Sequence, residues 1–348
     1  MKKGNKYGTH RVIEKAGQLP QTASKLNNNM DEIWDNEVLI DVRTLNVDSA
    51  SFTQLKEAAG GDEEKIRKNI TEIVSEHGKM QNPVTGSGGV LIGTVEKIGD
   101  ALKGKIDMKE GDRIVSLISL SLTPLRVDAV KDIRKDMDQA DIDGKAILFE
   151  KTLYSVLPTD LSEDLLLAAL DVAGAPAQAR RLSKPGDTVF IIGAGGKSGI
   201  LCAYEARKQV GEKGFVIGTG HSDTSTKRIK DMGFCDEVIQ VDATDPLKIE
   251  EDVARLTDGK MADLTINCVN VPATEMSSIL ATKDGGTIYF FSMATSFTRA
   301  ALGAEGIGKD INMIIGNGYA IDHAKITIDI LRESEKIRTV FEKMFVNK

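Results

Sequence analysis

The chain has 348 residues, a length typical of about two domains, and its 41% apolar and 28% charged residues are typical of a water-soluble globular protein. Its 45 basic and 52 acidic residues give a net charge of −7, so we expect no nucleic acid as a partner. No uncharged apolar run reaches the roughly 18 residues of a spanning helix, and none follows the basic start. We therefore expect no membrane partner, no signal peptide and a cytoplasmic location. Three cysteines without Cys-x-x-Cys spacing, and only four histidines, suit a reducing compartment and exclude a zinc ribbon.

The first half of the sequence predicts a small β-rich domain with helical insertions. In residues 37–45, apolar side chains recur at every second position, as in a half-buried strand. Residues 89–99, which are bounded by glycines, predict a second strand. Between them, residues 62–77 have the apolar spacing of an amphipathic helix. The turn at Lys109–Asp112 leads into the apolar run 114–118, which predicts a further strand.

The second half is more regular and predicts a doubly wound parallel sheet. Six short apolar runs are nearly continuous, as expected for strands that are buried on both faces, and helix-like segments separate most of them. The predicted strands are 188–192, 215–218, 237–241, 264–269, 287–291 and 311–315, and the predicted helices are 199–210, 224–232, 247–256 and 273–281. Residues 322–343 then predict one long amphipathic helix.

A glycine-rich turn follows the first strand of this series and precedes a helix. Its glycines have the spacing GxxGxxG, although the stricter GxGxxG pattern fails because its third position is a serine. Such a turn lets the backbone approach a pyrophosphate, and the helix amino terminus offers free N–H groups to the anion. The alternative is a purely structural turn. We predict dinucleotide binding by Gly193, Gly195, Gly196, Lys197 and Ser198.

The residues after the second strand of the series bear on which dinucleotide binds. An NAD site usually has an acid at this strand end, and here Gly220, His221 and Ser222 stand in its place. The loop that follows is rich in hydroxyl groups and contains Lys227 and Arg228, which would accept a 2′-phosphate. The alternative is that both cations only form the exposed face of the next helix. We expect NAD or NADP as the cofactor, with NADP bound no worse than NAD.

These elements together resemble the medium-chain dehydrogenase/reductase superfamily over nearly the whole chain. Residues 37–45 are similar to its first catalytic-domain strand, Gly93–Gly99 to its GxVxxVG segment, and Lys109–Val115 to its KxGDRV turn and strand.

This resemblance implies an α/β fold with two domains. A GroES-like, β-rich catalytic domain would comprise residues 1–158 and 321–348, and a doubly wound Rossmann nucleotide-binding domain would comprise residues 159–320. The superfamily commonly pairs two copies through the last strand of the nucleotide domain. We therefore expect a homodimer, built on the apolar segment Ile311–Ile315.

Zinc-dependent members of the superfamily have a cysteine after the first strand and a Gly-His-Glu segment before GxVxxVG. Aligned on those segments, the cysteine position is Asp48 and the histidine position is Gly89. A metal set rebuilt from Asp48, Glu76 and His77 is the alternative. The resemblance thus implies an enzyme that binds no zinc.

Four stretches are similar to the L-erythro-3,5-diaminohexanoate dehydrogenase family; they are Thr9–Glu14 with Gly17–Gln21, Gly78–Gly89, Asn267–Pro272 and Phe290–Phe297. This closer resemblance implies NAD(P)-dependent oxidative deamination of (3S,5S)-3,5-diaminohexanoate, a small diamino acid, to 5-amino-3-oxohexanoate and ammonia in anaerobic lysine fermentation. Gln81 departs from a histidine expected at its position, so we assign Gln81 no catalytic role.

Such a reaction needs a base, a group that positions water, and partners for a carboxylate and a second ammonium. We predict Asp48 as a proton acceptor or ammonium ligand, and Lys79 as a base or carboxylate ligand. The alternatives are an aspartate that caps a turn and an ordinary solvated lysine. The predicted substrate-binding residues are Asn82, Ser87, Asn270, Ser292 and Thr295, with Asn270 also at the cofactor; the alternative for the residues of the second half is a loop polar group with local partners.

Two other functions stay open. A zinc-free quinone or enoyl reductase of the same superfamily would need an apolar site lined by aromatic residues, and the chain has only one tryptophan, five tyrosines and ten phenylalanines. A protein that binds the cofactor without turnover would keep the same glycine turn.

Overall fold

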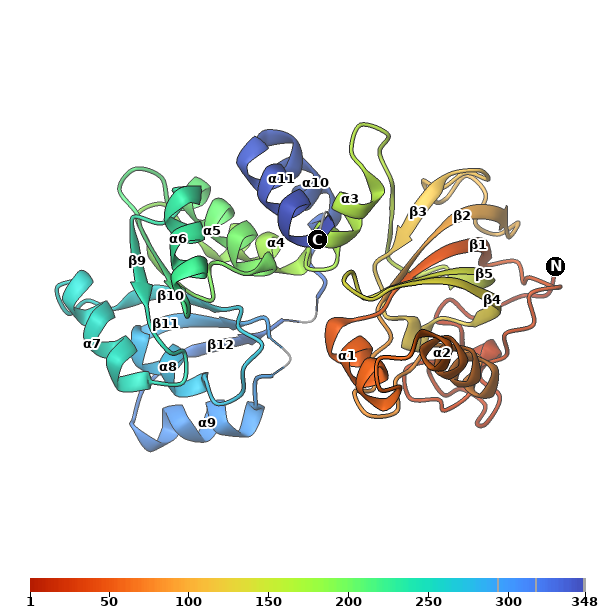
Figure 1. The fold of residues 1–348 in the computed structure, drawn as a ribbon, viewed down its shortest axis with the longest axis horizontal. Coiled ribbons are helices and arrows are strands. Elements are labelled where there is room, and N and C mark those ends of the chain that lie inside the picture. Colours follow the sequence, from red (N-terminus) through yellow and green to blue (C-terminus); the bar gives the residue numbers. More distant parts are fainter. Residues whose placement is uncertain (293, 317, 347–348) are drawn as a thin grey trace. The chain divides into compact units, whose positions relative to one another are not determined.

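The structure, a computed structural model, describes residues 1–292, 294–316 and 318–346. The described chain forms two compact units, Met1–Leu167 and a second that begins at Ala168 (Figure 1). Met293, in one of the family-specific stretches, and residues 347–348 of the predicted catalytic domain lie outside the described residues. None of the helices in the described ranges combines the length and apolar character that crossing a membrane requires.

The first unit contains a six-stranded antiparallel sheet in the order β4-β5-β1-β2-β3-β6. Its strands are β1 (Glu37–Asn46), β2 (Val90–Ile98), β3 (Arg113–Ser116), β4 (Leu125–Arg134), β5 (Gln139–Phe149) and β6 (Tyr154–Val156). The alternating residues Val38, Ile40 and Val42 of β1 are buried in one apolar core. The predicted strands and the β-rich character of this half are confirmed.

Helices α1 (Ser49–Ala58) and α2 (Glu63–His77) pack on this core (Figure 1). Helix α2 has the predicted bounds because Asp62 caps its first turn and Gly78, in the left-handed region, ends it. Helix α1 was not predicted, although its buried side chains Phe52 and Leu55 have helical spacing. The remaining short elements are the 3-10 helices η1 (Thr9–Arg11) and η2 (Leu120–Leu122), with α3 (Glu163–Leu170) after the sheet.

The second unit contains a six-stranded parallel sheet in the order β12-β11-β10-β7-β8-β9. Strands β8 and β9 are added on one side of β7, and β10 to β12 on the other, so the strand order reverses between β7 and β10. Its strands are β7 (Thr188–Ile192), β8 (Phe215–Gly220), β9 (Glu237–Gln240), β10 (Ala262–Asn267), β11 (Thr282–Phe290) and β12 (Asn312–Ile315). All six predicted strands are present. In sheets of this order, ligands bind at the carboxyl ends of the strands beside the reversal.

Helices cover both faces of this sheet (Figure 1). Val189 and Ile191 of β7 belong to one core with α5 and α6, while Phe190 and Ile192 face the core of α7 on the other side. Because both faces are buried, the strands read as continuous apolar runs. The helices are α4 (Gly174–Leu182), α5 (Lys197–Val210), α6 (Asp223–Met232), α7 (Pro246–Leu256), α8 (Glu275–Ala281) and α9 (Phe297–Gly306).

The prediction of one long helix over residues 322–343 is wrong. The structure has α10 (His323–Glu333) and α11 (Glu335–Phe341), followed by the π-helical turn η3 (Glu342–Val346). Ser334 is extended between them, and its side chain accepts a hydrogen bond from the Ile337 amide, so Ser334 begins a new helix. The apolar face stays continuous across the break, and periodicity alone therefore does not reveal it.

In this structure α10 packs on α4 and α11 on α5, within the second unit. The division into a GroES-like catalytic domain of residues 1–158 and 321–348 and a nucleotide domain of residues 159–320 stays a prediction.

Candidate functional site

The glycine turn lies where the sheet reversal of the second unit predicts a ligand. Gly193 follows β7 with φ +83°, the left-handed region that favours glycine, and its amide donates to the Thr219 hydroxyl at 3.0 Å. A Cβ on Gly199 would lie 2.1 Å from the Gly193 carbonyl oxygen, so helix α5 can approach the turn only with glycine at this position. At Gly196 the nearest atom would be 3.6 Å away, which leaves that backbone open. The turn therefore has the close packing and the exposed backbone of a phosphate cradle.

Helix α5 begins at this turn without a side-chain cap. Gly196 is its N-cap and makes no capping side-chain bond, so the amides of Lys197, Ser198 and Gly199 have no intrahelical acceptor. The Lys197 ammonium pairs with Asp171 at 3.2 Å and is half-buried, which restrains its side chain. Ser198 is buried. The anion-binding capacity of this helix end thus comes from backbone amides and the helix dipole.

The end of β8 presents hydroxyl groups and one anchored cation. Ser222 caps α6 in a capping box with Ser225, while Lys227 is exposed and pairs with Asp231 at 2.7 Å, which is the geometry of the structural alternative. Arg228 differs, because its Nη1 donates to the Gly195 carbonyl oxygen at 2.6 Å. Burial lowers the pKa of Arg228 below its usual value. Arg228 thereby ties α6 to the glycine turn.

The remaining predicted residues of this unit follow β10 and β11, which are adjacent and parallel. Asn267 is buried, and its amide bonds Thr274 and Ser278, which positions the loop after β10. Asn270 is exposed in that loop, and His221 is exposed after β8. Ser292 and Thr295 lie after β11, where the Ser292 hydroxyl accepts a hydrogen bond from the Ala294 amide. The structure therefore places these residues after the same ends of neighbouring strands as the glycine turn.

In the first unit, Asp48 is the N-cap of α1. One carboxylate oxygen accepts from the Ser51 amide at 3.1 Å, and the other accepts from the Ser51 hydroxyl at 2.6 Å. The Ser51 hydroxyl is fully buried and also bonds the Thr85 hydroxyl. Since Ser51 donates to Asp48, Thr85 must donate to Ser51. Asp48 thus performs the capping role of the structural alternative and also ends an oriented chain of hydroxyl groups.

The loop of residues 82–87 is organised by Asn82. This fully buried amide donates to the Ser51 carbonyl and the Gln54 side chain, and it accepts from the amides of Val84 and Thr85. These four bonds use its full hydrogen-bonding capacity. Asn82 therefore acts in this structure by holding Thr85 against Ser51. Ser87 is half-buried at the end of the loop, and its amide donates to Thr85.

Lys79 does not join this network. Its side chain is fully buried, so the alternative of a solvated lysine is wrong, and its ammonium donates to the carbonyls of Pro20 at 3.2 Å and Ala23 at 2.6 Å. Burial lowers the pKa of Lys79, and the nearby Glu14 carboxylate opposes that shift. The lysine therefore anchors the amino-terminal loop that contains one of the family-specific stretches.

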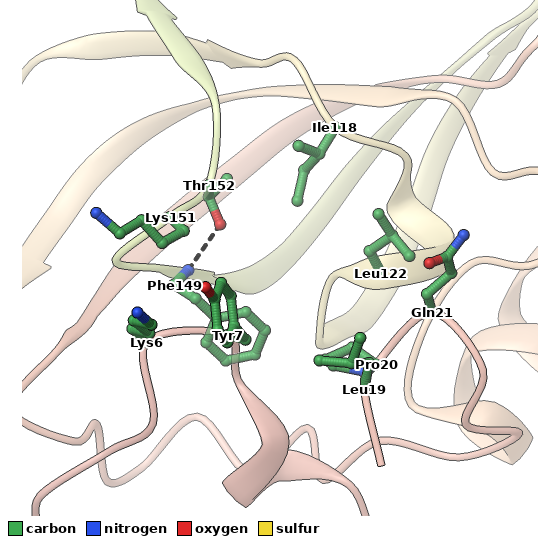
Figure 2. Close-up of a pocket in the computed structure, with 10 residues that line it drawn as sticks. All are labelled: Lys6, Tyr7, Leu19, Pro20, Gln21, Ile118, Leu122, Phe149, Lys151 and Thr152. Carbon is green, nitrogen blue, oxygen red and sulfur yellow. Dashed lines mark hydrogen bonds between the residues drawn. The ribbon is translucent and has the colours of Figure 1, made fainter. Parts of the chain in front are cut away.

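A pocket of about 190 Å³ lies beside this loop in the first unit (Figure 2). Leu19, Pro20, Ile118, Leu122 and Phe149 supply apolar walls. The predicted site residues do not line it, but Lys79 holds the Pro20 wall through the carbonyl bond described above.

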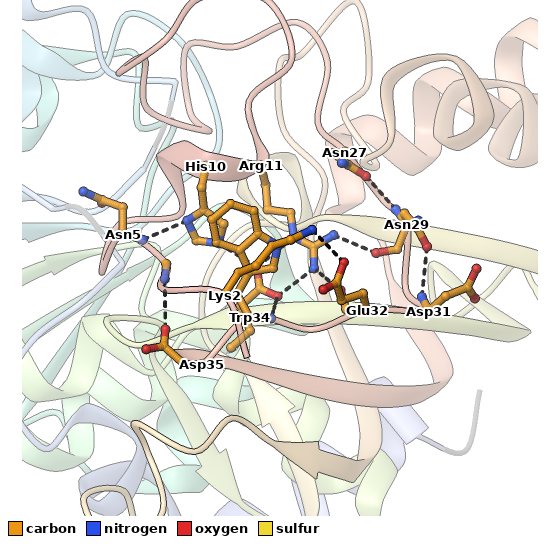
Figure 3. A network of polar contacts seen from close by, with 12 residues as sticks. Lys2, Asn5, His10, Arg11, Asn27, Asn29, Asp31, Glu32, Trp34 and Asp35 are labelled. Atoms are coloured by element: carbon orange, nitrogen blue, oxygen red, sulfur yellow. Dashed lines mark hydrogen bonds and ion pairs between the residues drawn. The ribbon is translucent and has the colours of Figure 1, made fainter.

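A second buried network fixes the amino-terminal arm on β1 (Figure 3). Arg11 donates through two nitrogens to the two carboxylate oxygens of Glu37, at 2.7 and 2.6 Å, and through Nη1 to the Asn29 carbonyl. His10 stacks on Trp34 and bonds Glu37 at 2.7 Å. Burial alone would raise the pKa of Glu37, but the hydrogen bonds from Arg11 and His10 outweigh it and lower the pKa from 4.5 to about 2.

The position aligned with a zinc-ligating histidine admits no side chain. Gly89 has φ +84°, and a Cβ there would lie 1.9 Å from the Asn46 carbonyl oxygen and 2.7 Å from the Val47 Cα. Within the described ranges, no three His, Cys, Asp or Glu side chains gather as a metal-ion site, and the alternative set of Asp48, Glu76 and His77 is not assembled.

Three side chains at these sites, Ser51, Thr85 and Gln54, were not predicted from the sequence. Ser51 stands three residues after Asp48, a spacing typical of an N-cap, and this signal was available. Thr85 and Gln54 contact residues that lie about thirty positions away in the sequence. A local sequence pattern cannot predict such contacts.

Comparisons with known proteins agree with both units. A family profile described as the L-erythro-3,5-diaminohexanoate dehydrogenase N-terminal domain matches residues 10–158, and one described as zinc-binding dehydrogenase matches residues 199–306. A relative from Acetoanaerobium sticklandii named L-erythro-3,5-diaminohexanoate dehydrogenase is 61% identical over 99% of this chain and 100% of its own length. A relative of the same name from Fusobacterium nucleatum is 58% identical, with coverage of 99% and 100%.

Solved structures show the same fold at low sequence identity. A quinone oxidoreductase from Pseudomonas syringae is 15% identical, with a TM-score of 0.55 and coverage of 91% of this chain and 89% of its own. A mycobacterial protein complexed with NADPH is 17% identical, with a TM-score of 0.55 and coverage of 96% and 95%. The predicted α/β architecture, a GroES-like unit with a doubly wound nucleotide-binding unit, is thereby confirmed.

Proposed function

Because the chain belongs to the L-erythro-3,5-diaminohexanoate dehydrogenase family, we propose that it catalyses the oxidative deamination of (3S,5S)-3,5-diaminohexanoate to 5-amino-3-oxohexanoate and ammonia, a step of anaerobic lysine fermentation. The observation that carries this proposal is full-length similarity to two relatives of that name. The protein is an oxidoreductase that acts on a small molecule with a nicotinamide cofactor. The quinone or enoyl reductase alternative rests only on fold-level similarity and is not favoured.

We assign the cofactor site to the glycine turn. The first-turn amides of Lys197, Ser198 and Gly199 would hold the pyrophosphate, and Gly193 and Gly195 keep the backbone close enough to reach it. When bound, a nicotinamide cofactor accepts a hydride from the carbon that bears the amine.

Two features bear on the choice between NAD and NADP. Strand β8 ends in Gly220 where an NAD site usually has an acid, and the Arg228 guanidinium donates to the Gly195 carbonyl. Both features favour a 2′-phosphate, so NADP binds no worse than NAD. Gly220, His221, Ser222 and Lys227 complete the proposed ribose side of the site.

Asp48 is the proposed proton acceptor for the substrate ammonium. An amine must lose its proton before hydride leaves the adjacent carbon, and the Asp48 carboxylate is the group proposed to receive it. Ser51 and Thr85 align the Asp48 carboxylate and form a path of hydrogen bonds toward the exposed 82–87 loop. Asn82 and Ser87 hold that loop in place, and we propose that they act on the substrate through it.

Lys79 is the second proposed catalytic group. Its lowered pKa means that the neutral amine forms at lower free-energy cost than in a solvated lysine. Two of the three N–H donors of the ammonium form hydrogen bonds with the carbonyls of Pro20 and Ala23. Asn270, Ser292 and Thr295 are the proposed partners of the substrate's polar groups in the second unit, where they follow the strand ends beside the glycine turn.

We propose that the reaction needs no zinc. The zinc-binding dehydrogenase profile covers residues 199–306 and includes neither Asp48 nor Gly89. At Gly89 the contact with Asn46 leaves no room for an imidazole. Acid–base chemistry by side chains therefore replaces Lewis-acid activation.

A homodimer is the proposed assembly. Strand β12 is an edge strand, and Ile315 on it is 58% exposed. An exposed apolar edge strand is a template for pairing with a second copy. The mass of the protein in solution, measured by light scattering, tests this, and a monomer mass overturns it.

The function is tested by following reduction of NAD and NADP with 3,5-diaminohexanoate, with lysine and simple alcohols as controls. We expect turnover with the diamino acid, release of one ammonia for each cofactor reduced, and little turnover with the controls. Reduction of a quinone by NADPH without turnover of the diamino acid would favour the alternative reductase. Cofactor binding without any hydride transfer would favour a binding protein.

A further inference from the structure

Two of the three cysteines meet beneath the glycine turn. The sulfur atoms of Cys202 and Cys268 are 3.9 Å apart, although 66 residues separate the two in sequence. Cys202 is fully buried on α5, and Cys268 is half-buried directly after β10. Ala194, Ile266 and Tyr289 belong to the apolar cluster that surrounds them. Two thiols are thus held in contact in a closely packed interior.

Both cysteines are rigidly connected to the turn that would hold the cofactor. The Cys268 amide donates to the carbonyl of Ile192, the residue before Gly193, at 3.0 Å. A Cβ on Gly193 would lie 2.5 Å from the Val269 side chain and 3.6 Å from the Cys268 carbonyl carbon. Cys202 lies on the helix whose first turn supplies the free amides. A movement of either sulfur therefore displaces part of the turn.

We propose that a hydroperoxide converts Cys202 and Cys268 to a reversible disulfide, and that this bond weakens binding of the cofactor at the glycine turn. The effect on the cofactor rests on the proposed function, whereas formation of the disulfide does not.

The chemistry balances within the pair and the oxidant. The more accessible Cys268 attacks the peroxide O–O bond as a thiolate and becomes a sulfenic acid, while water or an alcohol leaves. The Cys202 sulfur then attacks the Cys268 sulfur, and the S–OH bond breaks with loss of water. Two electrons pass from the two thiols to the peroxide. A dithiol reductant reverses the bond by exchange.

The bond demands movement because a disulfide has a sulfur separation of about 2.0 Å, well below the present contact. A packed interior transmits such a shift instead of absorbing it. The contact of Val269 with Gly193, and the position of Cys202 in α5, direct the shift to the amides that would hold the pyrophosphate. Cys268 is half-buried and Cys202 is fully buried, so the oxidant reaches Cys268 first. Burial also raises the pKa of Cys202 well above its usual value.

Cys235 is the matched control. It lies in the same unit beside Gly218, and burial raises its pKa to about 12. Cys235→Ser removes a half-buried thiol without touching the pair. Cys268→Ser and Cys202→Ala each remove one partner, and the alanine keeps the buried Cys202 site apolar.

The test treats the reduced full-length protein with hydrogen peroxide and maps peptides under non-reducing conditions. We expect the wild type and Cys235→Ser to lose the mass of two hydrogen atoms and to yield one linked peptide that joins residues 202 and 268. Neither Cys268→Ser nor Cys202→Ala should yield it. Titration of the oxidised protein with NADP and NAD should show affinity reduced by about tenfold or more, restored by dithiothreitol.

Absence of the linked peptide, or a link through Cys235, overturns the proposal. A linked protein with unchanged cofactor affinity overturns its second half. Failure of the diamino acid assay leaves both readouts intact, because peptide mapping and cofactor titration use no substrate.

Discussion

The two units build their candidate sites from different parts of the chain. In the second unit the glycine turn depends on backbone: Gly193 takes a left-handed conformation, Gly199 admits the helix, and the first-turn amides of α5 remain open. In the first unit, the polar side chains of Asp48, Lys79 and Asn82, which were predicted to act, have side-chain or backbone partners. Asp48 is bonded twice by Ser51, Asn82 uses all four of its hydrogen bonds, and Lys79 is held by two carbonyls.

The two kinds of site tolerate different substitutions. A backbone site is sensitive to added volume, because a single Cβ can close the approach of helix and strand. A side-chain network is sensitive to loss of a partner, because a buried polar group without one costs free energy. The same comparison extends to the Arg11–Glu37 network, which is the most buried ion pair of the first unit's amino-terminal arm. Substitutions that add volume in the second unit and remove charge in the first therefore test this difference between the two sites.

The largest effect is expected from Glu37→Gln. The change leaves the buried Arg11 guanidinium without its bidentate partner, which should lower the free energy of unfolding by about 4 kcal/mol. Chemical denaturation measures this. Glu32→Gln is the control, because Glu32 pairs with Lys2 at the surface and its loss should cost under about 1 kcal/mol. Equal effects of the two variants would contradict a stabilising role for the buried network.

The same carboxylate predicts a pH dependence. Since folding lowers the pKa of Glu37 from 4.5 to about 2, its stabilisation is fully present above pH 4.5 and is lost as the pH falls toward 2. We expect a loss of about 3 kcal/mol across this window, measured by denaturation at several pH values. Glu37→Gln should flatten the profile there. A profile unchanged by the substitution would show that other groups cause the acid sensitivity.

In the second unit, Gly199→Ala should have the next largest effect. Its Cβ would overlap the Gly193 carbonyl, and relief of the overlap requires α5 to move from the turn, at a cost of about 3 kcal/mol. The midpoint temperature of thermal unfolding should fall, and cofactor binding should weaken. Gly196→Ala is matched to it, with φ −85° and open space for a methyl group, and should keep wild-type stability. A destabilised Gly196→Ala with an unaffected Gly199→Ala would refute the backbone argument.

Asp48→Asn separates charge from capping in the first unit. Asparagine caps a helix as well as aspartate does, so stability should hold while turnover falls about a hundredfold and cofactor affinity stays unchanged. Asp62→Asn makes the same exchange at the N-cap of α2 and should leave turnover unaltered. If both variants turn over as the wild type does, Asp48 is a structural cap and leaves the list of catalytic residues.

The smallest expected effect is at Arg228. Arg228→Gln should weaken NADP binding by about tenfold more than NAD binding, since only NADP has the 2′-phosphate that the guanidinium would meet. Lys227→Gln on the same helix should change neither affinity appreciably, because Lys227 is exposed and paired with Asp231. An equal loss for both cofactors in Arg228→Gln would restrict Arg228 to holding the glycine turn through Gly195.

Much of the fold could be predicted from the sequence because its signals are local. Apolar runs and glycine turns located the six parallel strands, and Asp62 with Gly78 marked the ends of α2. The break at Ser334 was missed because the apolar face continues through it. Helix α1 was missed although Phe52 and Leu55 had helical spacing.

The candidate sites were predictable only in part. Residue identities alone pointed to a turn built of glycines, and the resemblance to the superfamily identified Asp48 and Gly89 as the positions where its zinc-ligating cysteine and histidine are absent. Partners distant in sequence were not predictable: Thr85 on Ser51, the carbonyls of Pro20 and Ala23 on Lys79, and Cys268 against Cys202. The scarcity of cysteine suggested a reducing compartment, and the tertiary structure brought two of the three into contact. Backbone turns are encoded by adjacent residues, whereas side-chain partners depend on how the whole chain packs.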